Sequence, residues 1–321
     1  MNFTISKKYI LLRLHKFMHS TVIKIPDCRA GHLVEWLRFI IDARNKRSNV
    51  WRRHYTFDFT NADFLSPFHL VSLACVIEEY KQTDNAISFK YAPKSSVEKY
   101  AKYSKFDYYW RNGFDKDYCL SLQTYSNTMP IWQHKQEYVD TFGMIVQRFY
   151  KSHFKGKDLT SLGLTVVEAL NNITDHANSP ISGFVATQYL PAKSRLIIAI
   201  CDFGVGIPYN VNQYLKKEGK HKLNDVNALE EALFQGFSTY SKPHNRGFGL
   251  DTILSNVKAS NGEIQIVSNK AYYTEQSVNN NVRRGKYDLQ FSFPGTYLII
   301  KFDTSTFRPI EQEFGGELEV L

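Results

Sequence analysis

Hydrophobic and polar residues repeat with two different periods along residues 21–110. Three short segments alternate every second residue, as strands do, and three longer ones repeat apolar residues every three or four positions, as helices do. The expected strands are 21–26, 54–60 and 86–91, and the expected helices are 31–44, 66–82 and 95–106. Ser66 and Pro67 stand where a helix N-cap and first position belong. This βαβαβα order predicts a small, largely parallel sheet with covering helices, to which residues 118–125 can add a strand.

The second half of the chain groups its helices and strands instead of alternating them. The expected helices are 132–153, 159–177, 250–259 and a helix near 227–236, the last one inside a long polar stretch at 209–246. The expected strands are 183–190, 195–200, 262–269, 287–293 and 295–303, with a hairpin loop at 279–281. Such grouping predicts an α+β unit with a mixed or antiparallel sheet, so the whole chain is expected to be α/β plus α+β.

Composition fits a soluble globular protein of about two domains, since 321 residues are 43% hydrophobic and 22% charged. No apolar run reaches the ~18 residues of a membrane span. Arg13 and Lys16 interrupt the apolar N-terminal stretch, so residues 1–20 are expected to form an extension and not a signal peptide. The four cysteines form no CxxC pair, which favours a reducing cytoplasm and gives no spacing for a zinc site.

Most of the net charge of +9 comes from residues 1–60, which hold twelve Lys and Arg against four Asp and Glu. The densest part is 44–53, and such a patch can attract nucleic acid or an acidic protein. A solvated loop between two elements explains the patch as well and is the favoured interpretation.

Four fragments of the second half carry candidate chemistry. Glu168 and Asn172 are four residues apart and share one face of the helix at 159–177, which can also be its solvent face. The strand at 195–200 ends in Asp202-Phe-Gly-Val-Gly, where a tight turn is the simpler explanation. Gly247-Phe-Gly249 precedes a helix, where backbone N–H groups can approach an anion. Gly295-Thr296 precedes the last apolar strand.

In this order the four fragments resemble the nucleotide-binding boxes of the GHKL superfamily, the Bergerat fold of gyrase B subunits, heat-shock chaperones, mismatch-repair ATPases, histidine kinases and anti-sigma-factor kinases. Residues 168–172 resemble the N box, 202–207 the G1 box, 247–250 the G2 box and 295–296 the last box. The resemblance covers about residues 135–303. It implies a sandwich in which helices cover one face of a mixed sheet, with ATP and Mg²⁺ as ligands.

The resemblance also implies a role for each matching residue. Asp202 would accept from the adenine amino group, Asn172 would bind Mg²⁺, and Glu168 would orient or deprotonate an attacking water. The remaining expected nucleotide contacts lie in the glycine boxes, beside them or in the last box, and are Gly204, Gly206, Ile207, Gly247, Gly249, Leu250 and Thr296. Residues 209–246 match the ATP lid. Arg246 stands where family members often have a glycine, so phosphate contact is expected to depend on Arg246 and the lid.

Residues 55–80 resemble the strand–turn–helix core of a STAS domain, the fold of anti-sigma-factor antagonists, and the resemblance covers about residues 20–112. Those antagonists carry a phosphorylatable Ser in a DSSG-like turn, whereas this turn reads LSPF and Ser66 fits an N-cap. A docking or dimerisation module is therefore expected in place of a phospho-switch. The expected organisation is an extension at 1–20, a STAS-like domain at 21–125, a histidine kinase-like ATP-binding domain at 132–308 and a tail at 309–321.

Taken together, these features predict a cytoplasmic, ATP–Mg²⁺-binding regulatory protein. Its GHKL domain would control a STAS-like module that binds a protein partner or a second copy of the chain. The alternative is an active ATPase, or a serine/threonine kinase of the anti-sigma-factor type. Nucleic-acid binding through residues 44–53 is a third and less favoured hypothesis. No membrane association is expected.

Overall fold

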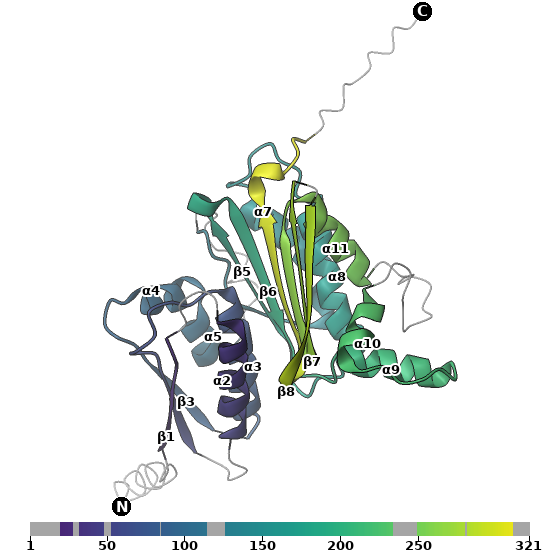
Figure 1. Ribbon diagram of the computed structural model, residues 1–321. Coiled ribbons are helices and arrows are strands. Elements are labelled where there is room, and N and C mark those ends of the chain that lie inside the picture. The colour runs from purple at the N-terminus through teal and green to yellow at the C-terminus, as the bar shows by residue number, and fades with distance from the viewer. Residues whose placement is uncertain are drawn as a thin grey trace, which may run out of the picture.

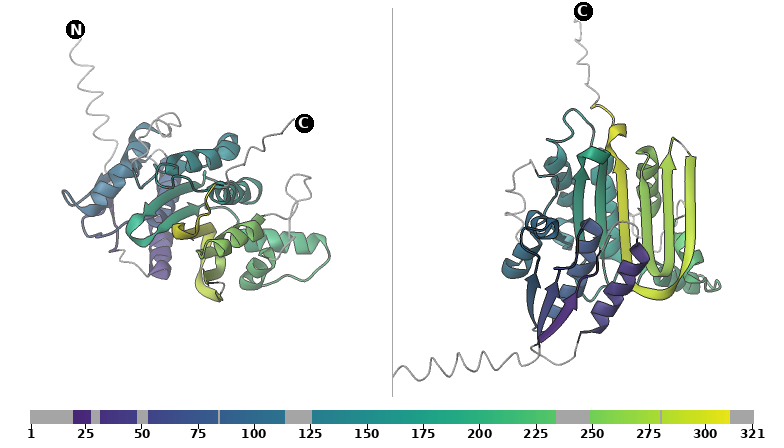
Figure 2. Two further views of the ribbon diagram at one scale, coloured as in Figure 1. Left: turned by 90° about the horizontal axis from the view of Figure 1, so that it is seen from above. Right: turned by 60° about the vertical axis from the view of Figure 1, so that its left-hand side comes forward.

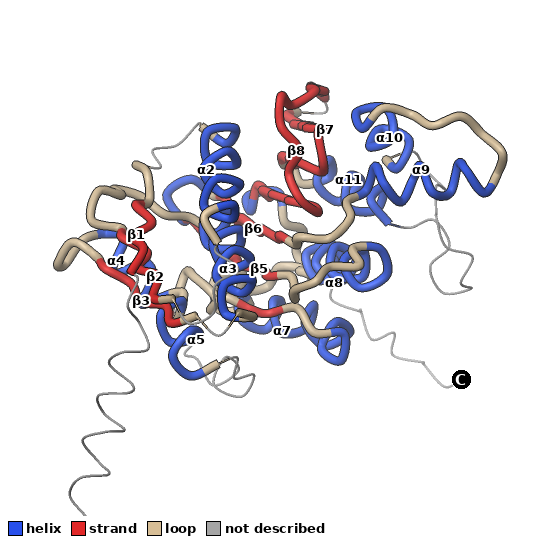
Figure 3. The backbone as a smooth tube through the Cα atoms, turned by 90° about the horizontal axis from the view of Figure 1, so that it is seen from below, coloured by secondary structure: helices blue, strands red, loops and turns tan. Residues whose placement is uncertain are grey.

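Two β-sheets and two helical layers alternate through the molecule (Figure 1). The computed structural model describes residues 20–27, 32–47, 53–83, 85–113, 126–233, 249–279 and 281–310. Helices α2 and α3 lie between the smaller sheet and the larger one, and α7, α8 and α11 lie on the far face of the larger sheet (Figures 1 and 3). None of the helices in the described ranges combines the length and the apolar composition that crossing a membrane requires.

The smaller sheet is parallel and has the order β1-β2-β3. Its elements in chain order are β1 (Ser20–Lys24), α2 (Leu33–Asn45), β2 (His54–Asp58), α3 (Pro67–Lys81), β3 (Ala86–Lys90), α4 (Ser96–Tyr103) and α5 (Phe106–Asn112). The predicted alternation of strands and helices is therefore confirmed. Ser66 is the N-cap of α3, and its backbone N–H donates to Nδ1 of the buried His69. The predicted strand at 118–125 lies outside the described residues.

The larger sheet is antiparallel and has the order β4-β5-β6-β8-β7. Its strands are β4 (Trp132–Gln133), β5 (Phe184–Leu190), β6 (Arg195–Cys201), β7 (Glu263–Val278) and β8 (Asn281–Asp303). The helices of this half are α7 (Val139–Tyr150), α8 (Thr160–His176), α9 (Ile207–Lys217), α10 (Asp225–Ala232) and α11 (Gly249–Ala259). Short 3-10 turns occupy Gln136–Tyr138, Pro191–Lys193 and Thr304–Thr306. The chain is thus a mixed α/β protein with one parallel and one antiparallel sheet.

The central strands of the larger sheet are buried on both faces. In β6, Leu196 and Ile198 belong to the core under α7, α8 and α11, whereas Ala199 and Cys201 belong to the core under α2 and α3. Successive side chains of a strand point to opposite faces, so the unbroken apolar run at 196–201 supplies both cores. The helices of the second half thus cover one face of its sheet, as expected, and α3 of the first half packs on the other face. The sheet is antiparallel, whereas the resemblance implied a mixed one.

One hydrophobic core thus joins the two halves of the chain. Phe184 of β5 has no exposed surface and contacts two rings of α5, with centroid distances of 5.6 Å to Tyr109 and 5.9 Å to Trp110. The hydroxyl of Tyr297 in β8 donates to the carbonyl oxygen of Phe68 in α3 over 2.6 Å. The boundary between residues 125 and 132 consequently separates two sheets that share a core.

Two expected elements differ from the structure. Residues 132–133 form strand β4 and not the start of a helix, because they pair with β5, and α7 begins at Val139. The polar stretch after Gly206 begins with helix α9 and not with a loop. Buried Val211 and Leu215 recur four residues apart in α9 and pack with Ala228 of α10 in a small core of their own.

The hairpin predicted at 279–281 is confirmed, and it joins two strands that are longer than expected. The N–H of Ser277 donates to the carbonyl oxygen of Gly262 over 2.9 Å. Fifteen extended residues would separate these groups by roughly 50 Å, so β7 must double back on itself. It does so near Asn269, which has a positive φ of 52° and lies at a register shift. Figure 2 shows the two long strands at the edge of the sheet.

Because the halves share a core, we expect Phe184→Ala to destabilise both together. Loss of a fully buried ring costs about 3–5 kcal/mol, and urea unfolding should remain one transition, with circular dichroism and tryptophan fluorescence coinciding at a lower midpoint. Met144→Ala is the control, since Met144 is 62% exposed on α7. Two separated transitions, with only the later one shifted, would contradict a shared core.

Candidate functional site

A buried carboxylate lies directly after strand β6. Asp202 is 2% exposed, its Oδ1 accepts from the N–H of Gly204 over 2.7 Å, and its own N–H donates to the carbonyl oxygen of Thr296 over 3.0 Å. Burial raises the pKa of Asp202 to about 7 from the usual 3.8, and backbone N–H groups of Gly204 and Thr296 oppose part of that rise. The turn therefore holds a carboxyl group that changes charge near neutral pH.

Close packing explains two glycines around this carboxyl group. A Cβ on Gly204 would overlap the carbonyl oxygen of Ala177, just beyond α8, and the N–H of Val205 donates to that same oxygen over 2.7 Å. Gly295 has a φ of 72°, and a Cβ there would overlap the backbone oxygen of Asp202. Both glycines hold the turn tightly against its neighbours. A contact of Gly204 with a base stays a prediction.

Sequence reasoning missed two polar residues that complete the turn. Ser268, fully buried at the reversal of β7, donates from Oγ to the carbonyl oxygen of Gly295 and accepts from the N–H of Ile207 at the start of α9, both over 2.9 Å. Ser268 Oγ also lies 3.2 Å from the Thr296 hydroxyl. Asn269 donates from Nδ2 to the carbonyl oxygen of Val205 over 3.2 Å. The available signal was a Ser-Asn pair that ends the apolar strand pattern at residues 264–267.

A second polar group forms where α8 meets the first residue of α11. A Cβ on Gly249 would lie 3.5 Å from Glu168 Oε1 and 3.6 Å from Asn172 Oδ1, so these side chains face the N-terminus of α11. Asn256 fixes this pair of helices by donating from Nδ2 to Thr165 Oγ1 over 2.9 Å. Glu168 and Asn172 are half-buried, which excludes a purely solvent-facing position for that side of α8.

The amide of Asn172 shows an unsatisfied polar atom. Its Nδ2 is buried and finds no hydrogen-bond partner among the described residues. The two ends of an amide are assigned from hydrogen bonds, so the group can present either its oxygen or its nitrogen to a ligand. A buried polar atom without a partner is costly in a folded protein and often marks a binding position.

The same helix connects the two groups. Ala177, which contacts the 202–206 turn, follows Asn172 by five residues, or about one and a half turns of α-helix. Figure 3 shows α8 and α11 beside strands β6 and β8. The structure therefore brings Asp202, Gly204 and Thr296 to one end of α8, and Glu168 and Gly249 to its neighbouring turns.

The other expected site residues divide into two sets. Gly206 is the N-cap of α9, and Ile207 and Leu250 are partly buried against the core under α8 and α11. Arg246 and Gly247 lie outside the described residues, so their nucleotide contacts stay predictions.

Within the basic patch at 44–53, Arg44 and Arg47 both donate hydrogen bonds to Glu79 of α3. This arrangement uses two of the cations that a nucleic-acid surface would need.

No protein-family model matches the chain, and no curated protein matches it. Among solved structures it is similar to the topoisomerase IV ATP-binding domain of Francisella tularensis in complex with a small-molecule inhibitor, at 13% identity and a TM-score of 0.28, covering 53% of this chain and 43% of that one. It is also similar to the B-subunit of DNA gyrase from Myxococcus xanthus, at 11% identity and a TM-score of 0.27, covering 52% and 45%.

A third similar structure is the 43K ATPase domain of Thermus thermophilus gyrase B in complex with an aminocoumarin, at 16% identity and a TM-score of 0.24, covering 55% of this chain and 43% of that one. The chain thus spans less than half the length of the solved structures it matches. At these scores the functional assignment depends on the residues of the site itself.

The raised pKa of Asp202 predicts a specific dependence of stability on pH. The native carboxyl keeps its proton up to about pH 7, whereas in the unfolded chain it titrates near 3.8, so the free energy of unfolding falls as pH rises between these values. Asp202→Asn removes this fall. Between pH 5 and pH 8, the free energy of unfolding of the variant should therefore rise by about 2–3 kcal/mol relative to that of the wild type. Urea unfolding at each pH measures this difference.

Asp58→Asn is the matched control, because hydrogen bonds from Thr60 lower the pKa of Asp58. Asp58 is then ionised in both states above pH 5, and the difference from wild type should stay constant from pH 5 to pH 8. An equally constant difference for Asp202→Asn would show that this carboxyl group titrates normally.

Proposed function

We propose that the second half of the chain binds ATP with Mg²⁺ in the groove formed by the 202–206 turn, α8 and the start of α11. The observation that carries the proposal is the buried Asp202 carboxyl group at the end of β6. An ionised carboxylate can accept from the amino group of adenine, whereas guanine has a carbonyl oxygen at that position. On this proposal, the chain has the nucleotide-binding arrangement of the GHKL superfamily.

The residues present fit such a ligand in two further respects. The Asn172 Oδ1 atom faces the first residue of α11, and Mg²⁺ takes oxygen ligands from amides, waters and phosphates. The first residue of α11 is a glycine beside Asn172 and Glu168, and N–H groups at a helix N-terminus attract phosphate. Asn172 would hold the metal ion, which would neutralise phosphate charge, and Arg246 and Gly247 would contribute from the preceding segment.

We favour a regulatory role for nucleotide binding over a purely catalytic one. The first half of the chain, with its parallel sheet, would bind a protein partner or a second copy and respond to nucleotide. Ligand binding can shift such an equilibrium only through a preference for one conformation. The shared core supports the proposal, because it gives the nucleotide groove and the first half a common packing surface.

Asp202→Asn should weaken ATP binding. The amide places an N–H donor against the adenine amino group, and mispairing a buried polar group costs about 1–3 kcal/mol, or roughly 5- to 150-fold in affinity. Isothermal titration calorimetry measures the loss, with Asp58→Asn as control. An unchanged ATP affinity of the folded Asp202→Asn variant would remove Asp202 from the nucleotide site.

ATP hydrolysis is the second candidate, because Glu168 lies one helical turn before Asn172 and faces Gly249. A carboxylate there can orient an attacking water. If the protein is an ATPase, Glu168→Gln should lower phosphate release by at least about a hundredfold while ATP affinity stays within a factor of about three. Phosphate release at the uncatalysed rate by the wild-type protein would leave binding alone as the function.

A further inference from the structure

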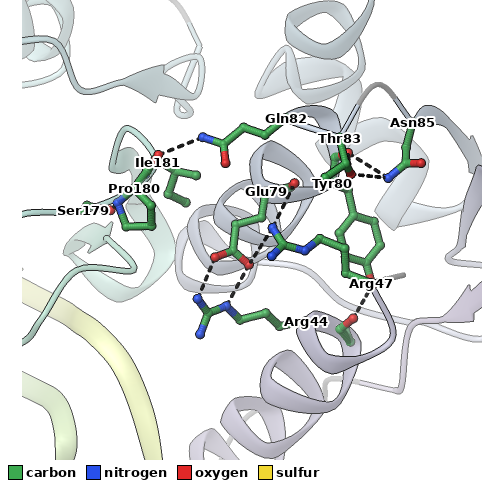
Figure 4. Close-up of polar contacts among 11 residues, drawn as sticks. Arg44, Arg47, Glu79, Tyr80, Gln82, Thr83, Asn85, Ser179, Pro180 and Ile181 are labelled. Atoms are coloured by element: carbon green, nitrogen blue, oxygen red, sulfur yellow. Dashed lines mark hydrogen bonds and ion pairs between the residues drawn. The ribbon is translucent and has the colours of Figure 1, made fainter. Parts of the chain in front are cut away.

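Two hydrogen bonds from α3 and the residue after it reach the second half of the chain near the 202–206 turn. Cys75 of α3 donates from Sγ to the carbonyl oxygen of Cys201 over 3.3 Å. Gln82, which follows α3, donates from Nε2 to the carbonyl oxygen of Pro180 over 2.8 Å, in the loop that leaves α8 beside Gly204 (Figure 4). The first half therefore contacts the residue just before Asp202 and the loop that leaves α8.

A bidentate ion pair lies at the centre of this contact surface. Arg44, in the last turn of α2, donates from Nε and Nη2 to the two carboxylate oxygens of Glu79 in α3, each over 2.7 Å (Figure 4). The Glu79 side chain is 3% exposed and the Arg44 side chain 32% exposed. A buried carboxylate needs its cation, and two parallel hydrogen bonds fix the plane of the guanidinium.

The same guanidinium lies over the ring of Phe203, the residue that follows Asp202 in the chain and belongs to the core under α2 and α3. Its Cζ is 5.0 Å from the centroid of Phe203, which is 2% exposed and packs edge-to-face on Phe293 with a centroid distance of 5.9 Å. A cation over an aromatic face is attracted to it, most strongly where water is excluded. Phe203 is thus held by α2 on one side and by β8 on the other.

Phe203 connects the two groups that define the candidate adenine position. It stands between Asp202 and Gly204, whose N–H donates to the Asp202 carboxylate. Packing that fixes the Phe203 ring also restrains the backbone between Asp202 and Gly204, on which this hydrogen bond depends. The link from α3 to the carboxylate is therefore a short series of contacts through Glu79, Arg44 and Phe203.

We propose that Arg44 is a positioning residue for the nucleotide groove: held by Glu79, it holds Phe203 and through it the Asp202–Gly204 turn, so that movement of α2 against α3 changes the groove. The regulatory meaning of this link depends on the proposed nucleotide binding. The link itself is a property of the protein without nucleotide. A partner that separates α2 from α3 would loosen the turn, and bound nucleotide would favour the closed pair.

Hydrogen exchange in the nucleotide-free protein tests the link directly. The N–H groups of Gly204 and Val205 are bonded in the native state and should exchange slowly. In Arg44→Met we expect both to exchange about tenfold faster. Arg38→Met is the matched control, since Arg38 is also on α2 and lies over Phe291, 5.4 Å from the ring centroid. Unchanged exchange in Arg44→Met, or equal acceleration in Arg38→Met, would overturn the proposal.

Arg44→Met leaves the buried Glu79 carboxylate with only the longer contact to Arg47, at 4.0 Å, and can unfold the protein, so Phe203→Leu provides a second test. It keeps the ion pair, removes the ring and should accelerate exchange at the same two N–H groups. Slow exchange at both positions in folded Phe203→Leu would overturn the proposal on its own.

A double-mutant cycle on ATP affinity separates positioning from general destabilisation. Arg44→Met should lower ATP affinity about tenfold in the wild-type background and have no further effect in Phe203→Leu, because Arg44 acts through that ring. Additive losses would mean that Arg44 acts by another route. If wild-type protein binds no ATP, the proposed function fails, and the exchange measurement still decides whether Arg44 positions the turn.

Discussion

Strands β5, β6 and β8 carry apolar side chains on both faces, and each face must therefore be covered. The second half of the chain supplies α7, α8 and α11 for one face, and α3 of the first half packs on the other. Each Å² of apolar surface that is removed from water stabilises the fold by about 25 cal/mol. This free energy strongly favours covering both faces. The layered arrangement of the whole protein follows from this requirement.

Two-sided burial also sets the chemistry of the candidate site. A carboxyl group at the end of a strand with one solvent-exposed face would remain hydrated and would keep a pKa near its usual value. Asp202 instead ends a strand that α3 covers, and burial raises its pKa to about 7. The cost of burying it is offset only in part by two backbone N–H groups. A ligand that donates a hydrogen bond to the ionised carboxylate would recover more of that cost.

The local patterns of the sequence predicted most individual elements. Ser66-Pro67 marked the start of α3, and the alternation of three strands with helices was correct, because caps and periodicity act within a few residues. The one helix expected at 95–106 is instead two helices, α4 and α5. The unbroken apolar run at 196–201 indicated burial on both faces, since a strand with one solvent-exposed face alternates. That α3 covers the second face was not predicted from this pattern.

Contacts between distant residues could not be predicted in the same way. Arg44 and Glu79 are 35 positions apart, and the charge pattern made Arg44 part of a solvated basic loop. Asp202 was found from its place after a strand, whereas Ser268 and Asn269 became visible only once β7 was seen to double back. Residues 132–133 joined a strand because their partners in β5, Val185 and Phe184, lie 53 and 51 positions further along the chain.

Calorimetric titration of the full-length wild-type protein with ATP and with GTP, each with and without Mg²⁺, tests the central claim most directly. The account predicts that ATP binds, that Mg²⁺ strengthens the binding, and that GTP binds at least about tenfold more weakly because it offers a carbonyl oxygen to the Asp202 carboxylate. Equal binding of both nucleotides, or no heat of binding with ATP and Mg²⁺, would contradict it.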